Sequence, residues 1–484
     1  MRKVPPRDLI LYLFSFVLLY LYVHAFRSTF IDDAFIQFKY ADTLVRHGNW
    51  GFFAGQTTNT ATSPLNVLTI SLFTLITGSV VSSAIWLTTS LLFFLWIVLQ
   101  HLSGKLFGDS YFGNFLSIAI AANPLLLSCL GMETMLFVAL FITSLSLFFF
   151  QRWYWLALSL ALLSLARPDG FLLFLILSVL VFLRPLPTKK KFLFVALYVI
   201  TLVPWHLYSW IHLGSFLPDT LIIKTNQQAW YGNVSFGSGL LHLYFVKFPL
   251  EMVFSLVLLP FAFLAFRSSN QSARQLMLIV ITYSVIHYIA YTALKVPPYH
   301  WYYAPLALGC VLSGSIGIAC FFGYRRGIRW LLFILPLLGL LSLVASQGLR
   351  FREAPIHTNW ATHDQYQEVG EWLRRNTDAS QTFIMAGEIG TLAYYSDRYL
   401  LNNFSDPWLM QRLLNRNPNK ESVLFKLNYL WRKEPTRYPR ASYILEHMLS
   451  SHRERSGPEI VKSWRTSCRW VSEGRIYLRT RNGQ

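Results

Sequence analysis

Charged residues are scarce in this chain. They make up 13% of its 484 residues, against roughly a quarter in an ordinary soluble domain. Hydrophobic residues reach 54%, and apolar runs such as 9–26, 192–211 and 331–345 with its flanks approach the roughly 20 residues that cross a bilayer. This composition excludes a soluble single-domain enzyme and indicates a polytopic membrane protein.

Acidic residues, cysteines and nucleotide-binding motifs are also few or missing. The 23 Asp and Glu residues face 42 Lys and Arg, which gives a formal charge of +19. Much of this excess lies in short loops between apolar runs, where basic residues set orientation and meet anionic lipids. Four cysteines offer no disulfide framework or zinc spacing, and no P-loop, dinucleotide fingerprint or zinc-protease motif occurs. We therefore expect membrane lipids, and no nucleic acid, as partners.

The apolar runs predict about 11 membrane-crossing helices once the basic N-terminus is placed in the cytoplasm. The run 65–81, broken by Thr, Ser and Asn, is left out as an interfacial or re-entrant segment, and whether it crosses stays open. The basic loops, including the one with Arg325, Arg326 and Arg329, then all fall inside, as the positive-inside rule requires. The helices lie near 9–26, 83–101, 111–129, 132–150, 153–166, 171–183, 192–211, 248–267, 275–294, 299–322 and 329–347.

The same orientation gathers the unusual polar groups on the outer side of a cell or inner membrane. Only Lys and Arg were used to set the orientation, so the gathering of acidic and mixed motifs on the opposite face is an independent observation. It predicts an outward-facing polar site.

The chain changes character after about Ser346, where apolar runs shorten and charges rise. Helical periodicity and strand-like stretches then alternate. We predict an all-α polytopic membrane domain over 1–347, with an outer loop at 27–82, and a small extracytoplasmic α/β domain over 348–484. Within the latter we expect a helix at 364–375, a strand at 382–385, a helix near 392–395 and a strand near 399–401.

Two adjacent carboxylates, Asp32 and Asp33, follow the first apolar run. An aspartate at the centre of a membrane helix costs about 2.5 to 3.5 kcal/mol, so this pair must lie in water or in a polar cavity. Consecutive helical residues do not face each other, so one can meet a reactant while the other binds a metal or orients substrate. The alternative is that both merely cap the amphipathic stretch 34–45.

Arg167 and Asp169 belong to an Arg-Pro-Asp-Gly turn between two short apolar runs. The preceding run, 153–166, has 14 residues, a helix of about 21 Å, which is less than a hydrocarbon core of roughly 30 Å. Arg167 is therefore expected below the outer surface, where its guanidinium requires a fixed anion. A lipid phosphate and Asp169 both satisfy that requirement.

Three further outer segments carry polar groups. Glu133 opens a predicted helix, where helix-dipole stabilisation alone would explain it. Asp219 and Lys224 begin the longest outer loop before the tail, and His300 lies in an aromatic helix start that would otherwise be ordinary interfacial anchoring.

Taken in order, these motifs resemble the GT-C superfamily of integral-membrane glycosyltransferases, most closely the subgroup that includes mycobacterial terminal arabinofuranosyltransferases. The resemblance spans almost the whole chain and departs at Phe35, Asp219 and 57–59, so the sugar does not transfer. The matching segments are Asp32-Asp33-Ala34-Phe35, Thr62-Ser63-Pro64-Leu65, Gly131-Met132-Glu133-Thr134, Arg167-Pro168-Asp169-Gly170, Leu217-Pro218-Asp219-Thr220 with Lys224, and Gly387-Glu388-Ile389-Gly390 through Ser396.

The resemblance implies an inverting transfer of a hexosyl or pentosyl group from a polyprenyl-phosphate donor to a glycan, lipid or protein acceptor of the cell envelope. One carboxylate takes the acceptor proton, and cations stabilise the departing phosphate. The sequence favours Asp32 as base without separating it from Asp33, which would orient substrate or bind a divalent cation (Mg²⁺, Mn²⁺ or Ca²⁺). Arg167, Lys224 and His300 are the expected phosphate ligands, and Glu133, Asp169 and Asp219 are expected to line the cavity.

Two other functions fit a helical membrane protein with charges in a cavity. A lipid-sugar flippase or transporter is expected to show internal repeats, and none is evident in the sequence. A non-catalytic glycan-binding protein would not require a carboxylate pair and buried cations together. Formation of a new glycosidic bond by purified protein separates the enzyme from both.

Overall fold

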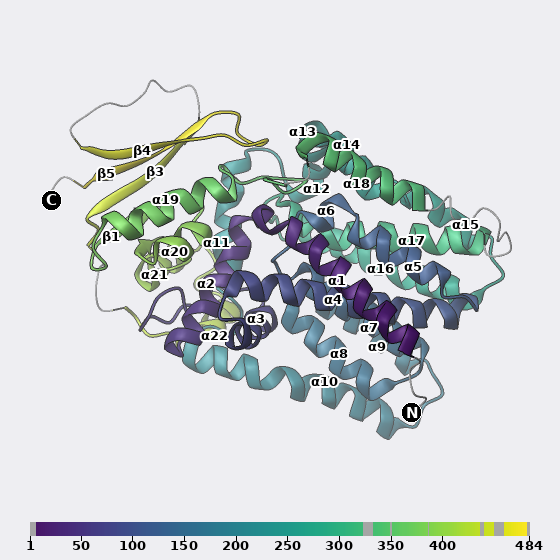
Figure 1. The fold of residues 1–484 in the computed structure, drawn as a ribbon. Coiled ribbons are helices and arrows are strands. Elements are labelled where there is room, and N and C mark those ends of the chain that lie inside the picture. The colour runs from purple at the N-terminus through teal and green to yellow at the C-terminus, as the bar shows by residue number, and fades with distance from the viewer. Residues whose placement is uncertain are drawn as a thin grey trace. The chain divides into compact units, whose positions relative to one another are not determined.

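The chain forms two interleaved compact units in a computed structural model that describes residues 6–322, 333–348, 351–385, 387–435, 440–449 and 459–481 (Figure 1). The first unit comprises 1–27, 81–202 and 234–356, and the second comprises 28–80, 203–233 and 357–484. The division of the chain at residue 347 into a membrane domain and an outer domain stays a prediction. The basic loop with Arg325, Arg326 and Arg329, and residues 329–332 of the last predicted helix, lie outside the described residues.

Helices make up the first unit, and most lie where the apolar runs predict them. For example, α8 occupies the predicted 153–166, and α9 starts one residue before its prediction. The longer helices are α1 (Pro6–Ala25), α4 (Val80–Phe107), α5 (Tyr111–Ala121), α7 (Thr134–Phe149), α8 (Trp153–Ala166), α9 (Gly170–Phe182), α10 (Thr188–Tyr208), α16 (Gln271–Ala293), α17 (Ala304–Phe322) and α18 (Ile334–Gln347).

Short helical pieces join these helices. They are α6 (Pro124–Leu127), α12 (Phe236–Gly239), η4 (Leu240–Tyr244), α13 (Phe245–Lys247), α14 (Pro249–Leu256), η5 (Leu259–Ala262), α15 (Phe263–Phe266) and η6 (His300–Tyr302).

Proline interrupts two of the helices that the sequence predicts as continuous. The predicted helix 111–129 ends at Ala121 and restarts at Pro124 as α6, with Asn123 capping the new start. The predicted helix 248–267 breaks after Leu256, four residues before Pro260, which cannot donate a hydrogen bond to the carbonyl of Leu256. Apolar composition identified these segments but not the breaks within them.

Five segments in the described part of the chain are long and apolar enough to cross a membrane. They are Val80–Phe107, Thr188–Leu213, Pro249–Phe266, Gln271–Ala293 and Ala304–Phe321. Seven shorter apolar helices accompany them, including the segment Pro64–Thr77 that the sequence left as interfacial. The protein is thus a multi-pass membrane protein in architecture, while the number of 11 crossings and their direction stay predictions.

The second unit combines helices with a mixed sheet. Its helical elements are η1 (Arg27–Thr29), α2 (Asp32–His47), α3 (Pro64–Thr77), the end of α10, η2 (Ser209–Leu213), α11 (Thr220–Gln227), η3 (Gln228–Tyr231), α19 (His363–Asn376), α20 (Gly390–Ser396), α21 (Pro407–Asn415) and α22 (Val423–Asn428). Local signals explain two of the starts. Ser63 caps α3 with Pro64 in its first turn, and Thr362 and Gln365 form a capping box at α19.

The sheet has five strands in the order β2-β1-β3-β5-β4. Strands β1 (Thr382–Met385) and β2 (Tyr399–Leu401) are parallel to each other and confirm the two strands predicted from sequence. Strand β3 (Tyr443–Leu449) continues the parallel part, and β4 (Ile460–Thr466) and β5 (Gly474–Thr480) complete an antiparallel part. The α/β character expected for the C-terminal segment is therefore present.

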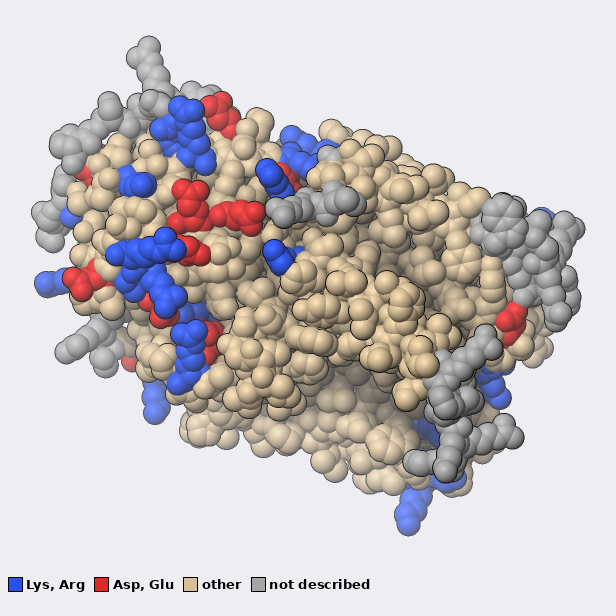
Figure 2. Space-filling model, viewed as in Figure 1, with Lys and Arg blue, Asp and Glu red and all other residues tan. Residues whose placement is uncertain are grey.

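Charge is distributed very unevenly on the face drawn in Figure 2. Lys, Arg, Asp and Glu side chains gather over the unit that contains the sheet, whereas the helices of the first unit present a face with few charges. An apolar surface of that kind, on helices of membrane-crossing length, is what a lipid environment requires.

Candidate functional site

Asp32 begins α2 and is bound by another helix of the same unit. Its Oδ2 accepts a hydrogen bond from the backbone N–H of Gly390 at 2.9 Å, and its Oδ1 accepts one from Thr391 at 2.7 Å. These N–H groups lie in the first turn of α20, where unpaired donors and the helix dipole favour an anion. The sequence also allowed both aspartates to cap their own helix. In the structure the Asp32 carboxylate instead caps α20, a helix more than 350 residues away in the chain.

The Gly-Glu-Ile-Gly segment makes this close approach sterically feasible. A Cβ on Gly390 would lie 2.1 Å from the backbone oxygen of Asp32, so only glycine fits against the start of α2. Gly387 has a φ of +106°, and a Cβ there would meet the ring of Trp360 at 2.9 Å. Steric contacts therefore explain why both positions of the motif are occupied by glycine.

Glu388, between these glycines, is the centre of a hydrogen-bond network that the sequence did not reveal. The side-chain amide of Asn359 donates to its Oε1 at 2.7 Å, while the Oδ1 of Asn359 accepts from the backbone N–H of Asp32 at 3.1 Å. The backbone N–H of Trp360 and the hydroxyl of Tyr366 also donate to the Glu388 carboxyl. Asn359 therefore connects Glu388 directly to the start of α2.

Burial shifts both carboxyl groups towards their protonated forms. It raises the pKa of Asp32 to about 6, because the loss of solvent outweighs the two backbone hydrogen bonds, and the neighbouring Asp33 charge adds to the rise. Burial and the nearby Asp32 carboxylate raise the pKa of Glu388 to about 8. At neutral pH the fold thus favours an ionised Asp32 beside a protonated Glu388.

Asp33 points to a different partner, Lys224 of α11. Their Oδ1 and Nζ atoms lie 2.8 Å apart, and the lysine also stands over the ring of Phe404 at 5.3 Å. The Asp33 side chain keeps 17% of its surface exposed, against 8% for Lys224. A carboxylate and an ammonium group that the sequence placed almost 200 residues apart are therefore in contact.

Asp219 immediately precedes α11 and pairs with Arg432, a residue that the sequence did not single out. The two side chains approach to 2.9 Å, and burial raises the pKa of Asp219 although Arg432 opposes that rise. The backbone N–H of Asp219 donates to the carbonyl of Asn59 at 2.8 Å, and the Thr220 hydroxyl donates to the carbonyl of Thr60 at 2.5 Å. The loop before α3 thus holds the start of the helix that carries Lys224.

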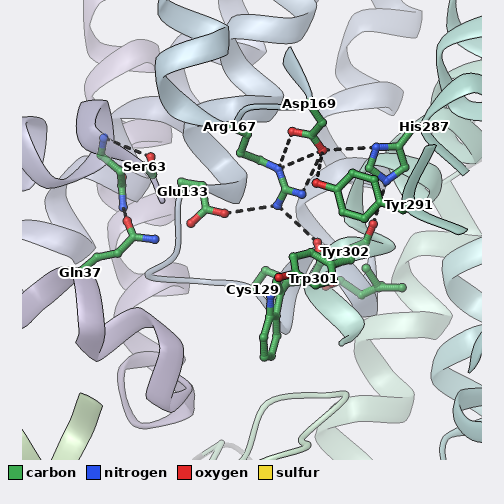
Figure 3. Close-up of polar contacts among 12 residues, drawn as sticks. Gln37, Ser63, Cys129, Glu133, Arg167, Asp169, His287, Tyr291, Trp301 and Tyr302 are labelled. Carbon is green, nitrogen blue, oxygen red and sulfur yellow. Dashed lines mark hydrogen bonds and ion pairs between the residues drawn. The ribbon is translucent and has the colours of Figure 1, made fainter. Parts of the chain in front are cut away.

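A second polar cluster lies in the first unit, around Arg167 (Figure 3). The guanidinium contacts Asp169 through Nε and Nη2, each at 3.0 Å from a carboxylate oxygen. It also donates from Nη1 to Glu133 at 3.3 Å and to the carbonyl of Trp301 at 3.4 Å. The side chain is only 5% exposed, so Arg167 has the fixed anions that its burial requires, while its role as a ligand of a lipid phosphate stays a prediction.

His287 and Tyr291 of α16 complete this cluster. The Nδ1 of His287 and the hydroxyl of Tyr291 each lie 3.3 Å from Oδ2 of Asp169, while the Nε2 of His287 faces the carbonyl of Tyr302 at 3.0 Å (Figure 3). Neither α16 residue was predicted, because an apolar helical run gives no signal for one polar face. Spacing could have helped, since positions 287 and 291 are one turn apart.

His300 is buried in the same unit. It is 0% exposed, and its Nε2 lies 3.3 Å from the carbonyl of Ser128. The predicted site residues thus fall into two groups, Asp32, Asp33, Asp219 and Lys224 in the second unit and Glu133, Arg167, Asp169 and His300 in the first. That both groups serve one outward-facing pocket stays a prediction, as do their individual roles.

The carboxylates of the second unit do not fit a resident divalent cation as they stand. Such ions take several oxygen ligands, but both oxygens of Asp32 accept backbone N–H bonds, and Asp33 holds Lys224. Among the described residues no three His, Cys, Asp or Glu side chains converge as a metal site would need.

Solved structures show which fold this is. No protein-family model matches the chain, and no curated protein matches it in sequence. A crystal structure of ArnT from Cupriavidus metallidurans bound to undecaprenyl phosphate aligns over 98% of this chain and 98% of its own, with a TM-score of 0.62 and 11% identity.

Two more solved structures have the same fold. The Archaeoglobus fulgidus oligosaccharyltransferase in complex with Zn and sulfate aligns over 89% of this chain and 67% of its own, with a TM-score of 0.52 and 13% identity. Mycobacterial arabinofuranosyltransferase AftD aligns over 90% and 35%, with a TM-score of 0.50 and 13% identity. The chain therefore has the fold of GT-C integral-membrane glycosyltransferases, and at these identities the likeness extends to the fold alone.

Proposed function

We propose that the protein is a glycosyltransferase that moves a sugar from a polyprenyl-phosphate donor to a cell-envelope acceptor, with inversion at the anomeric carbon. The alignment with undecaprenyl-phosphate-bound ArnT over nearly the full length of both chains supports the donor class. The observation that carries the proposal is the contact between Asp33 and Lys224 beside Asp32. It supports the proposal because a carboxylate, which a base requires, and a cation, which a leaving phosphate requires, belong to one group of side chains.

The geometry favours Asp33, rather than the Asp32 expected from sequence, as the base. Both Asp32 oxygens already accept backbone N–H bonds, whereas Asp33 is the more exposed carboxylate and has one close cation. When a donor phosphate binds Lys224, the Asp33 carboxylate is released to accept a proton. Asp32 then acts as a positioning residue that fixes the start of α2.

The reaction proceeds by direct displacement. The acceptor hydroxyl oxygen attacks the anomeric carbon and forms the new glycosidic bond while the bond to the phosphate oxygen breaks. The hydroxyl proton goes to Asp33, and the bonding electrons leave with the polyprenyl phosphate, whose charge Lys224 stabilises. Neighbouring carboxylates favour the oxocarbenium-like transition state as in glycoside hydrolysis.

The test uses purified protein with radiolabelled polyprenyl-phosphate hexose and pentose donors and a panel of acceptors. Asp33→Asn and Lys224→Met should each lower transfer by about 10²-fold or more, and Lys224→Met should also weaken donor binding. Asp42→Asn is a matched control, because Asp42 lies on the same helix and pairs with Arg46 at 2.8 Å. Wild-type turnover in Asp33→Asn would refute the assignment of the base.

We further infer that transfer takes place at the outer face, with the N-terminus in the cytoplasm and the C-terminal α/β segment outside. Support comes from the distribution of Lys and Arg in the loops. Because Asp32 and Arg167 are buried, cysteines are introduced at their exposed neighbours Arg27 and Pro168. Both should react with a membrane-impermeant reagent added from the outer side and not with the same reagent added from the inner side. Labelling of the two positions from opposite sides would contradict a shared outer pocket.

A further inference from the structure

Helix α22 of the second unit exposes an unusual amount of apolar surface. Leu424 is 81% exposed and Val423 is 71% exposed. Leu427, Leu430 and Trp431, one and two turns further on, are also about half exposed. Val423, Leu424 and Leu427 lie at spacings that share one side of the helix, and Leu430 and Trp431 add exposed apolar surface in the turn that follows it. We call residues Val423, Leu424, Leu427, Leu430 and Trp431 the α22 face.

The same segment is attached to the end of a candidate membrane span. The indole N–H of Trp210, in the span Thr188–Leu213, donates to the carbonyl of Leu427 at 2.8 Å. The backbone N–H groups of Phe216 and Leu217, just beyond the span, donate to the backbone and side-chain oxygens of Asn428. These contacts all lie within the second unit, and Figure 1 shows α22 beside the end of α10.

The C-terminal part of the span Thr188–Leu213, which α22 contacts, has exposed apolar side chains. Only 17% of the apolar window of Thr188–Leu213 is buried. Val203, Leu207 and Ile211, each one turn from the next, are exposed. A helix of this length and composition with an exposed apolar side is suited to contact with lipid. The α22 face is therefore tied directly to a lipid-facing helix where that helix ends.

Charge around α22 also matches a membrane surface. Residues 416–434 contain five basic side chains and two acidic ones. Arg432 pairs with Asp219 and Lys426 with Glu421, so the exposed cations that can face a membrane surface are Arg416, Lys420 and Lys433. A mostly basic segment that carries Leu and Trp on one side is the pattern of helices that lie in the plane of a membrane interface. Tryptophan is enriched at that level of the bilayer.

The opposite side of α22 is polar and aromatic. The rings of Phe425 and Tyr429 contact each other in a tilted arrangement with centroids 4.8 Å apart and, with Arg432 and Gln411, line a cleft of about 250 Å³. The segment thus has one side engaged with its own unit and one side without protein cover among the described residues.

We propose that α22 and the turn to Trp431 lie in the membrane interface, with the α22 face among the lipid acyl chains and the basic side chains at the phosphate level. The occupant of this face is the lipid bilayer at the end of the span Thr188–Leu213. This surface is independent of the proposed transfer reaction.

The first experiment needs no substitution. The full-length protein is reconstituted in vesicles of phosphatidylethanolamine and phosphatidylglycerol that contain a phospholipid with a photoactivatable acyl chain. Trypsin cuts after Lys420, Lys426 and Arg432, so the face falls into two peptides, 421–426 and 427–432. Both should carry lipid adducts several times more often than the peptide 376–398 of the same unit. Equal labelling of all three peptides, or none on the α22 peptides, overturns the proposal.

The second experiment measures depth. A spin label on Leu424→Cys, in a chain whose Cys129, Cys310, Cys320 and Cys468 are replaced by alanine, should relax with lipid-soluble oxygen and resist a water-soluble nickel complex. A label on Arg375→Cys, also highly exposed in this unit, should show the reverse. If the nickel complex reaches the label at position 424, α22 lies in water. If neither reagent reaches it, protein covers the α22 face. Either result overturns the proposal.

Discussion

Replacement of Glu388 by glutamine should remove a large part of the pH dependence of stability. A carboxyl group whose pKa is higher in the folded chain than in the unfolded chain takes up a proton on folding. For Glu388 the pKa rises from 4.5 to about 8. Its contribution to stability is therefore fully present below about pH 4.5 and is lost as the pH rises through about 8.

The size of this effect follows from the shift. A rise of that size corresponds to about 5 kcal/mol at full effect, and since Glu388 is only partly shielded from solvent, about 2 to 3 kcal/mol is the expected loss. Glutamine is isosteric and neutral at every pH, and its oxygen can still accept from Asn359 and Trp360. Glu388→Gln should thus resemble the wild type below about pH 4.5, become increasingly more stable than it between about pH 4.5 and 8, and keep that advantage near pH 9.

The assay is thermal unfolding of the reconstituted protein, followed by tryptophan fluorescence across this pH range. Glu371→Gln serves as the matched control, because Glu371 lies on the surface of α19 in an exposed pair with Arg375. The wild type and the control should both lose stability between about pH 4.5 and 8 and level off above that range. If Glu388→Gln shows the same pH profile as they do, burial of a protonated Glu388 is wrong.

Three other outcomes are expected. Transfer should rise with pH through about 6, because protonation of Asp32 weakens its hold on α20; a pH-rate profile that is flat across this range would exclude that role. Arg167→Ala should destabilise the protein by about 3 to 5 kcal/mol in denaturant titrations, because it removes the guanidinium that neutralises the buried carboxylates of Asp169 and Glu133, and an unchanged unfolding midpoint would argue against the ion cluster. Gly390→Ala should cost about 1 to 3 kcal/mol and lower transfer, since its Cβ would collide with Asp32; full stability and activity together would contradict that packing.

Local sequence patterns predicted those helices and strands whose formation depends mainly on residues close together in the chain. The apolar run 153–166 is α8, and the stretch 382–385 is β1. The strands β3, β4 and β5 were not located, although Ile476 and Leu478 alternate with Arg475 and Arg479 along β5, the period expected for a strand with one buried face. Their pairing spans long separations, which local propensity does not report.

The candidate site was predictable in its residue types but not in its partners. Asp33 and Lys224 are unusual in their sequence surroundings, whereas their contact depends on how α2 and α11 pack. Arg432 and Glu388 gave no signal as members of the site, because a lone charge in a polar segment is ordinary. Their contacts form only in the folded chain, where Arg432 meets Asp219 and Glu388 meets Asn359, Trp360 and Tyr366.

The hydrogen bonds from α20 to Asp32 can form only after most of the chain has been synthesised. Asp32 leaves the ribosome early, and the backbone N–H groups that donate to it follow more than 350 residues later. A chain shortened before residue 390 contains neither Gly390 nor Thr391, so the Asp32 carboxylate lacks both of its backbone donors. Prematurely terminated products should accordingly lack the contacts that fix the start of α2, the segment to which we assign the transfer chemistry.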